Sequence, residues 1–249
     1  MVREPGDIGG GTESPAAGRR YNCVIMRIVL GAFALATASV VAQVPPSASE
    51  TSSYAGLFAA AASGDTAGIA KLAAAGANVG ARDGNGRTPL IVAAFAGQRD
   101  AMRALVAADA DANALDADRY DIVTIAAVAN DLPTLEVALA IGCRATSVTS
   151  RYDGTALIAA AHLGHVEVVR ALIRAGAPLD HVNNLGWTAL IESIVLGDGG
   201  PRHLATLTSL VDAGANVNLP DRGGMSPRKL AQARGYGEMV KVLERAGAK

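Results

Sequence analysis

Residues 88–97 of the 249-residue chain read Thr-Pro-Leu-Ile-Val-Ala-Ala-Phe-Ala-Gly and carry the signals of one short helix. Thr88 is an expected N-cap, and Pro89 suits the first helical turn because its missing N–H would have no partner there. Gly97 tolerates the positive φ that closes a helix. We therefore expect a short helix that begins after Thr88 and ends before Gly97.

A second kind of helix follows the first in each stretch of about 33 residues. It is typified by residues 166–173, Val-Glu-Val-Val-Arg-Ala-Leu-Ile, whose apolar positions Val166, Val169 and Leu172 share one helical face. Gly176 then ends this helix, and a polar turn leads onward. Two short helices and a turn therefore make one unit.

The landmarks that close the first helix recur along the chain in steps of 33, 33, 34, 33 and 38 residues. They are Gly64, Gly97, Asn130, Gly164, Gly197 and Gly235. A second landmark follows twelve residues later in five of the six units. It follows seventeen later in the fifth, so we expect an inserted loop, Asp198 to His203, between the two helices of that unit. The units span about 54–82, 83–115, 116–149, 150–182, 183–220 and 221–249.

The repeated motif and spacing resemble those of ankyrin repeats. The segments that carry the resemblance are Thr88-Pro89-Leu90, Thr155-Ala156-Leu157, Thr188-Ala189-Leu190, Ser226-Pro227 and Gly214-Ala215-Asn216. The third unit departs from the motif with Asp121-Ile122-Val123 and Asn130, and the first and last units read as terminal caps. The resemblance implies an all-α solenoid of about six helix-turn-helix repeats with β-turn/hairpin loops over residues 54–249.

Composition excludes several classes of function. Half of the residues are apolar, only 4% are aromatic, and the 52 alanines suit helices packed close together. A net charge of -1 without a basic block argues against a nucleic acid or an anionic membrane as partner. Two cysteines, Cys23 and Cys143, are too few for a disulfide framework or a cysteine-based zinc site. We expect no cofactor and a monomeric chain.

The amino-terminal region has the pattern of an export signal. An apolar stretch from Ile28 to Ala42 follows Arg27 and ends in small residues before Gln43, and it is too short for a membrane span. We expect translation to begin at Met26, with residues 1–25 as a start-site extension, 26–42 as a signal peptide cleaved near Ala42, and 43–53 as a polar leader outside the fold. The alternative is a long amino-terminal region in front of the same signal.

The sequence offers little catalytic chemistry. It has no Gly-x-Ser-x-Gly elbow and no phosphate-binding loop, and Cys143 is expected to be a buried small thiol. His162 and His165 are three residues apart and, with the inserted loop, define the competing class, a metal-binding or enzymatic protein. The interpretation we favour is a protein without enzymatic activity and without a bound metal.

A binding face is predicted on the turn tips and on the exposed side of the first helices. Aromatic and arginine side chains, which form the hot spots of protein interfaces, gather there. The candidate partner-binding residues are Arg87, Phe95, Arg119, Tyr120, Arg151, Tyr152, His162, Leu185, Trp187, Arg222 and Met225. For the first-helix positions Phe95 and His162, packing between neighbouring repeats is the alternative.

The combination of an export signal with ankyrin-like repeats is similar to periplasmic members of the family in bacteria. That resemblance implies a concave face that grips a partner protein, in oxidative-stress defence beside a catalase or in an immunity protein that blocks a secreted toxin. A cytosolic ankyrin adaptor with an unprocessed apolar amino terminus is the third reading.

Overall fold

The computed structural model describes residues 43–249, and the predicted start-site extension 1–25 and signal peptide 26–42 lie outside the described residues. From Tyr54 onward the helices come in six pairs. The pairs are α3 (Gly56–Ser63) and α4 (Thr66–Ala74), α5 (Pro89–Phe95) and α6 (Arg99–Ala107), α7 (Ile122–Val128) and α8 (Leu132–Ala140), α9 (Ala156–Leu163) and α10 (Val166–Arg174), α11 (Ala189–Val195) and α12 (Pro201–Asp212), and α13 (Pro227–Ala233) and α14 (Gly237–Arg245). The predicted all-α solenoid of about six repeats is confirmed.

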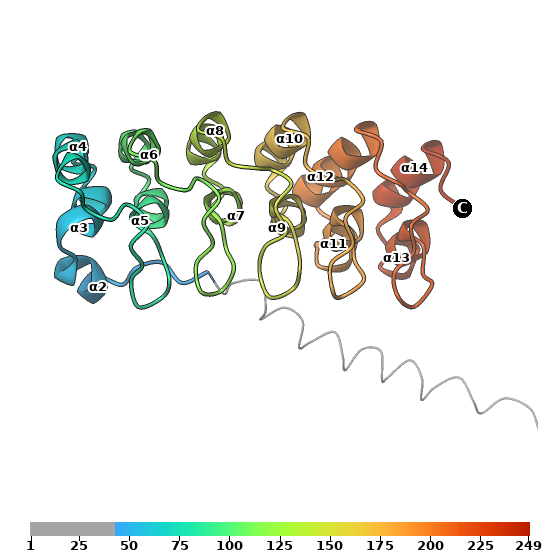
Figure 1. Ribbon diagram of the computed structural model, residues 1–249. Helices are drawn as coiled ribbons and strands as arrows, with labels where there is room; N and C mark the ends of the chain where they lie inside the picture. The colour runs from blue at the N-terminus through green and yellow to red at the C-terminus, as the bar shows by residue number, and fades with distance from the viewer. Residues whose placement is uncertain (1–42) are drawn as a thin grey trace, which may run out of the picture. The chain divides into compact units, whose positions relative to one another are not determined.

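The two helices of each pair lie in separate rows, and the connecting loops project beyond the row of first helices (Figure 1). We call these loops fingers 2 to 6; they comprise residues 76–88, 109–121, 142–155, 176–188 and 214–226. Within residues 43–249 the only β pairing is an isolated antiparallel bridge between Thr149 and Gly154 in finger 4. The described chain therefore consists of two helical layers with a row of fingers.

The first helices begin where the repeated motif places their caps. The Thr88 hydroxyl accepts a hydrogen bond from Ile91 N at 3.3 Å, and Thr155 and Thr188 cap α9 and α11 in the same way. In the third repeat Asp121 takes this role, because its Oδ1 accepts from Thr124 N at 2.8 Å. The departure from the motif at Asp121 therefore keeps the cap, a contact worth about 1 kcal/mol.

The residues that close the first helices adopt the left-handed region in five of the six repeats. Asn130, with φ of 54°, replaces the glycine found at Gly97, where φ is 66°. The fifth repeat differs, since the positive φ of 71° occurs at Gly199 instead of Gly197. Gly197 is required for a different reason, because a Cβ there would lie 2.1 Å from the carbonyl oxygen of Ser193.

Small side chains fill the contact between successive first helices. Ala61, Ala93, Ala127 and Ala160 are fully buried and belong to one continuous core that runs through all six repeats. Alanine at these positions lets neighbouring helices approach closely. The alanine excess of the sequence is therefore explained by the repeat contacts.

The predicted inserted loop is helical over much of its length, which corrects the sequence prediction. Helix α12 begins at Pro201 and has 12 residues, whereas α10 has nine. Only the short turn before Pro201 is irregular, and Asp198 Oδ1 accepts a hydrogen bond from Gly200 N there at 2.8 Å. The insertion thus lengthens the second helix by about one turn.

The polar leader, predicted to lie outside the fold, packs against finger 2. Residues 48–53 form helix α2 (Ala48–Ser53), which begins with a capping box between Ser47 and Glu50. Arg87 of finger 2 bonds to the leader twice, through the carbonyl oxygen of Val44 and the carboxylate of Glu50. Residues 43–53 are therefore part of the folded unit.

Candidate protein-binding face

Backbone hydrogen bonds join the fingers into one row. Finger 3 donates from Ala117 N to Asn85 O of finger 2 at 3.0 Å, and finger 4 donates from Ser150 N to Arg119 O at 2.9 Å. Finger 5 continues the series through Asn184 N and Tyr152 O at 2.9 Å. These bonds hold the tips of fingers 2 to 5 in a fixed order.

Fingers 2, 3, 5 and 6 also have an internal bond that fixes the position just before the helix cap. A side-chain oxygen four residues earlier accepts from the backbone N–H there, as Asp83 does from Arg87 at 2.9 Å and Asp116 does from Tyr120 at 2.8 Å. Asn183 does the same for Trp187, and Asp221 for Met225. The four residues Arg87, Tyr120, Trp187 and Met225 therefore occupy equivalent positions.

Exposure at these equivalent positions differs, and this corrects two sequence predictions. Arg87 is 0% exposed and Tyr120 4%, whereas Met225 is 36% exposed and Trp187 is half-buried. Arg87 is covered by the leader, and Tyr120 is part of the hydrophobic core, where burial raises the pKa of its phenol. Neither side chain is available to a partner in this arrangement.

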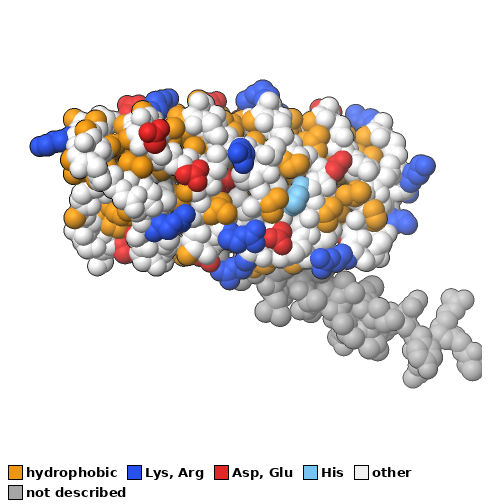
Figure 2. All heavy atoms as spheres, in the orientation of Figure 1, with side chains coloured by type: hydrophobic (Ala, Val, Ile, Leu, Met, Phe, Trp, Pro, Cys, Tyr) orange, Lys and Arg blue, Asp and Glu red, His pale blue; other side chains and the backbone are white. Residues whose placement is uncertain are grey.

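Exposed apolar side chains gather on fingers 4 to 6. Val148, Val182 and Leu185 are 40%, 46% and 41% exposed, and Met225 follows on finger 6. Leu185 and Met225 are among the predicted partner-binding residues. The two valines are not, because their only signal is a β-branched apolar residue inside a polar turn. Lys and Arg side chains recur along the finger edge of the molecule (Figure 2).

Three predicted arginines lie exposed on the fingers. Arg119 and Arg151 form crossed ion pairs between fingers 3 and 4, to Asp153 at 3.0 Å and to Asp118 at 2.9 Å. Arg222 lies against Gly186 of finger 5, where a Cβ would come within 2.4 Å of its Cγ. Exposed pairs of this kind stabilise the fold by at most about 1 kcal/mol, so their charges remain open to exchange with a partner.

The predicted first-helix positions are only partly exposed. Phe95 packs against the core, and His162 places Nδ1 3.1 Å from Oε2 of Glu192 in the next repeat. Glu192 is 3% exposed and also accepts from Asn183 Nδ2 at 2.9 Å. Glu192 is not among the predicted site residues, although it is a single acid in the largely apolar helix α11.

His162 and His165 do not converge on one point. Nδ1 of His165 lies 2.9 Å from Ala127 O, and burial lowers the pKa of its imidazole. His203 has Nε2 2.9 Å from His162 O and Nδ1 2.7 Å from Asp198 Oδ1. In the part of the chain that the structure describes, no group of three or more His, Cys, Asp or Glu residues is placed to hold a metal.

Cys143 is a buried thiol whose sulfur lies 3.1 Å from Ala112 O. Burial raises the pKa of the thiol to about 12, so it stays protonated at neutral pH.

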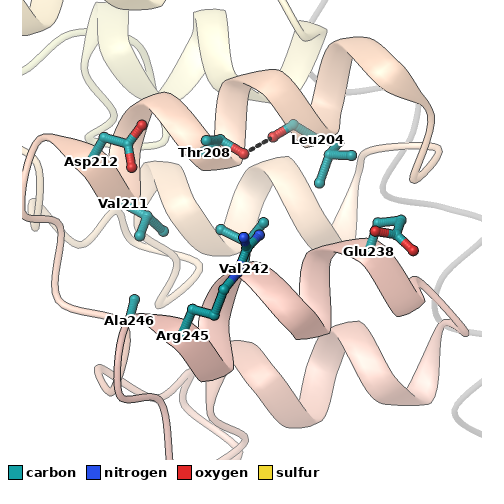
Figure 3. A pocket seen from close by; sticks show the side chains of 8 residues that line it. All are labelled: Leu204, Thr208, Val211, Asp212, Glu238, Val242, Arg245 and Ala246. Atoms are coloured by element: carbon teal, nitrogen blue, oxygen red, sulfur yellow. Dashed lines mark hydrogen bonds between the residues drawn. The ribbon is translucent and has the colours of Figure 1, made fainter.

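A shallow groove of about 590 Å³ lies on the other side of the repeats, between α12 and α14 (Figure 3). Leu204, Val211 and Val242 form its apolar lining, and Glu238 and Arg245 also line it. The groove lies in the row of second helices, separate from the fingers.

A family model for three copies of the ankyrin repeat matches residues 57–149 and 123–221, which together cover more than half of the chain. The chain belongs to the ankyrin-repeat family. Ankyrin repeats generally mediate protein–protein interaction, and ankyrin repeat domains are typically non-catalytic interaction modules.

Solved ankyrin structures match nearly the whole described part of this ankyrin chain. An ankyrin repeat domain from Acinetobacter baumannii AYE is 43% identical, with a TM-score of 0.70, and the match covers 78% of this chain and 98% of that one. The ankyrin repeat domain of Bcl-3, a member of the IkappaB protein family, is 27% identical with a TM-score of 0.70, over 79% of this chain and 88% of that one.

A curated relative matches part of the ankyrin repeats. The putative ankyrin repeat protein YahD of Escherichia coli K12 is 36% identical over 120 residues, which are 48% of this chain and 59% of that protein. The match thus spans less than two thirds of this relative. Within residues 43–249, no helix combines the length and the apolar character needed to cross a bilayer.

Proposed function

We propose that this ankyrin-repeat chain is a non-catalytic protein-binding module exported to the bacterial periplasm, and that a partner lies across the tips of fingers 3 to 6. The observation that carries the proposal is the row of exposed apolar side chains on fingers 4 to 6. Fully burying an exposed side chain of this size contributes roughly 1.5–3 kcal/mol, and less than half of that is available at each of these residues because they are 36–46% exposed. Four such residues therefore form a plausible hydrophobic centre for an interface.

The backbone of finger 3 supports a functional role for Arg119. Arg119 has φ of 65°, at the position where fingers 2, 5 and 6 have Gly86, Gly186 and Gly224. A left-handed conformation costs a non-glycine residue roughly 1–2 kcal/mol. Strained residues of this kind cluster at binding sites, which supports a role in binding for the Arg119 side chain.

The finger row is also pre-organised. Backbone hydrogen bonds join each of fingers 2 to 5 to the next one in the absence of a partner, so binding does not have to order these loops. The crossed pairs of Arg119 and Arg151 hold their side chains over the same row. A rigid row lowers the entropic cost of association.

A role without catalysis is consistent with how the reactive side chains are engaged. His162 and His203 make hydrogen bonds that join repeats, and Cys143 is buried. Nucleophilic or general-base catalysis needs such a group to face a substrate.

The export part of the proposal rests on the sequence pattern at Ile28 to Ala42. Amino-terminal sequencing of the mature protein tests it, and the expected first residue is Gln43. A mature chain that begins upstream of Ile28 would contradict export.

The binding part is tested by chemical cross-linking in periplasmic extract, followed by mass spectrometry of the captured partner. We expect the double variant Leu185→Ala/Met225→Ala to lose the partner, whereas Arg170→Ala, an exposed change on α10, keeps it. One tightly bound enzyme that loses its activity would identify an immunity role, and several weakly bound clients a stress or assembly role. Equal capture by the wild-type chain and both variants would refute the finger row as the interface.

A further inference from the structure

The guanidinium of Arg87 is shared between finger 2 and the leader. Its Nε donates to Asp83 Oδ2 at 2.7 Å within the same finger. Its Nη1 donates to the carbonyl oxygen of Val44 at 3.0 Å, and its Nη2 donates to Oε1 of Glu50. The outward half of a fully buried arginine is therefore satisfied entirely by residues 43–50.

The leader is attached almost without apolar burial. Helix α2 has no buried residue, and Val44 is 54% exposed. Besides the two bonds from Arg87, Asn85 Nδ2 donates to the same Glu50 oxygen at 2.7 Å. A segment that buries little apolar surface of its own and is held by a few polar contacts detaches at a lower cost than a helix of the core.

The receiving side is held in place by its own finger and by Tyr54, the residue that follows the leader. Asp83 accepts from the backbone N–H groups of Asn85 and Arg87, both at 2.9 Å, and from the Tyr54 hydroxyl at 2.7 Å. Asp83 is thereby held in position, and it orients the Arg87 guanidinium by accepting the bond from Nε. The Arg87 side chain therefore stays oriented when the leader leaves.

We propose that finger 2 carries a binding site for an acidic peptide whose glutamate lies in a short helical turn, and that the leader occupies this site in cis, with Glu50 in α2. One guanidinium nitrogen of Arg87 and the Asn85 amide bind the same carboxylate oxygen, and a second guanidinium nitrogen binds a peptide carbonyl six residues earlier. The ligand is thus a segment of another protein with a glutamate placed as Glu50 is. This site is separate from the tips of fingers 3 to 6 and does not depend on the proposed function.

The tether makes the leader a strong competitor. A segment joined by a short connection is present at an effective concentration of about 1 mM. A free peptide with the same contacts is therefore excluded from the wild-type chain. A partner gains access only by making additional contacts or when the leader is weakened.

The experiment measures fluorescence anisotropy of a labelled peptide with the sequence of residues 43–53, added to the full-length chain. We expect the Glu50→Ala chain to bind this peptide at least about tenfold more tightly than wild type, because the competitor in cis has lost its carboxylate. A peptide with glutamine in place of the glutamate, and the double variant Glu50→Ala/Asn85→Ala, are each expected to bind more weakly. The matched control Glu136→Ala, on the exposed side of α8, should bind like wild type.

Two results would overturn the proposal. The first is a Glu50→Ala chain that does not bind the peptide, or that binds the glutamine peptide equally well. The second is a Glu50→Ala chain that fails to fold in a thermal melt, since a displaceable occupant is not required for folding. Because the finger-tip variants are not involved, neither result bears on the proposed partner interface.

Discussion

His162 of the fourth repeat and Glu192 of the fifth form a partly buried pair, with 3.1 Å between Nδ1 and Oε2. The second carboxylate oxygen of Glu192 accepts from Asn183 Nδ2 at 2.9 Å. One buried carboxylate therefore links the first helices of two repeats with finger 5.

Replacing Glu192 with alanine is expected to lower the free energy of unfolding by about 1–3 kcal/mol, because the amide of Asn183 loses its acceptor while buried. Glu192→Gln keeps an acceptor and should cost less than Glu192→Ala. Urea denaturation measures both, with Glu136→Ala as the control for removing an exposed acid. Equal losses for alanine and glutamine would contradict the role of the hydrogen bonds.

Arg119→Gly is expected to separate stability from binding. Glycine adopts φ of 65° without strain, so the free energy of unfolding should stay within about 1 kcal/mol of wild type despite the lost pair with Asp153. Partner capture should weaken. A thermal melt measures the stability and the cross-linking assay measures partner capture. A large loss of stability with unchanged capture would show that Arg119 serves the fold and not the binding of a partner.

Gly197→Ala is expected to destabilise the fifth repeat. The added Cβ would lie 2.1 Å from Ser193 O and 2.8 Å from the His203 ring, so the backbone must shift, at a cost of about 2 kcal/mol or more. Gly84→Ala is the matched control, because nothing lies within 4 Å of a Cβ there. Similar melting temperatures for the two variants would show that the turn before α12 adapts freely.

Acid is expected to release the leader. Hydrogen bonds from the Ser47 backbone and side chain, with a further contribution from Arg87, lower the pKa of Glu50 below its usual value of 4.5. Ser47 leaves together with Glu50, so only the part of the lowering that comes from Arg87 stabilises the docked state. That contribution is present above pH 4.5 and is lost as the pH falls through the lowered value. Burial alone would raise the pKa of Asp83, but hydrogen bonds from Tyr54 and Arg87 lower it, so it acts in the same direction.

NMR titration of the Glu50 carboxyl carbon measures this directly, together with the amide shifts of residues 47–53. In Glu50→Gln the acid-induced change of these amides should be smaller. A Glu50 pKa at or above 4.5 would contradict the ion pair with Arg87.

The helices of the repeats are predictable because the residues that begin and end each one are recognisable in the sequence. A threonine, serine or aspartate cap and a closing glycine or asparagine recur at fixed spacing, and each depends only on residues nearby in sequence. Asp121 departs from the threonine of the motif, but its side chain accepts the same capping bond, from Thr124 N. Local chemistry thus accounts for the helices.

The candidate site was less predictable because exposure depends on distant residues. Arg87 and Met225 occupy equivalent positions, yet only Arg87 has a partner 37 residues away in Glu50. The sequence of the leader has no helical periodicity from which its contact with Arg87 could be predicted. The sequence likewise predicts a loop for the inserted segment, because Gly199 and Gly200 are typical of loops, whereas a further helical turn begins at Pro201.

The additional turn of α12 limits how far the array is modular. His203 of this turn reaches back to His162 O in the fourth repeat, and Tyr236 of the sixth repeat donates back to Gly197 O of the fifth at 2.9 Å. Repeat arrays lengthen and shorten by whole units when each interface is interchangeable with the next. Here specific hydrogen bonds join the fourth unit to the fifth and the fifth to the sixth. These three units would therefore have to be gained, lost or transplanted together.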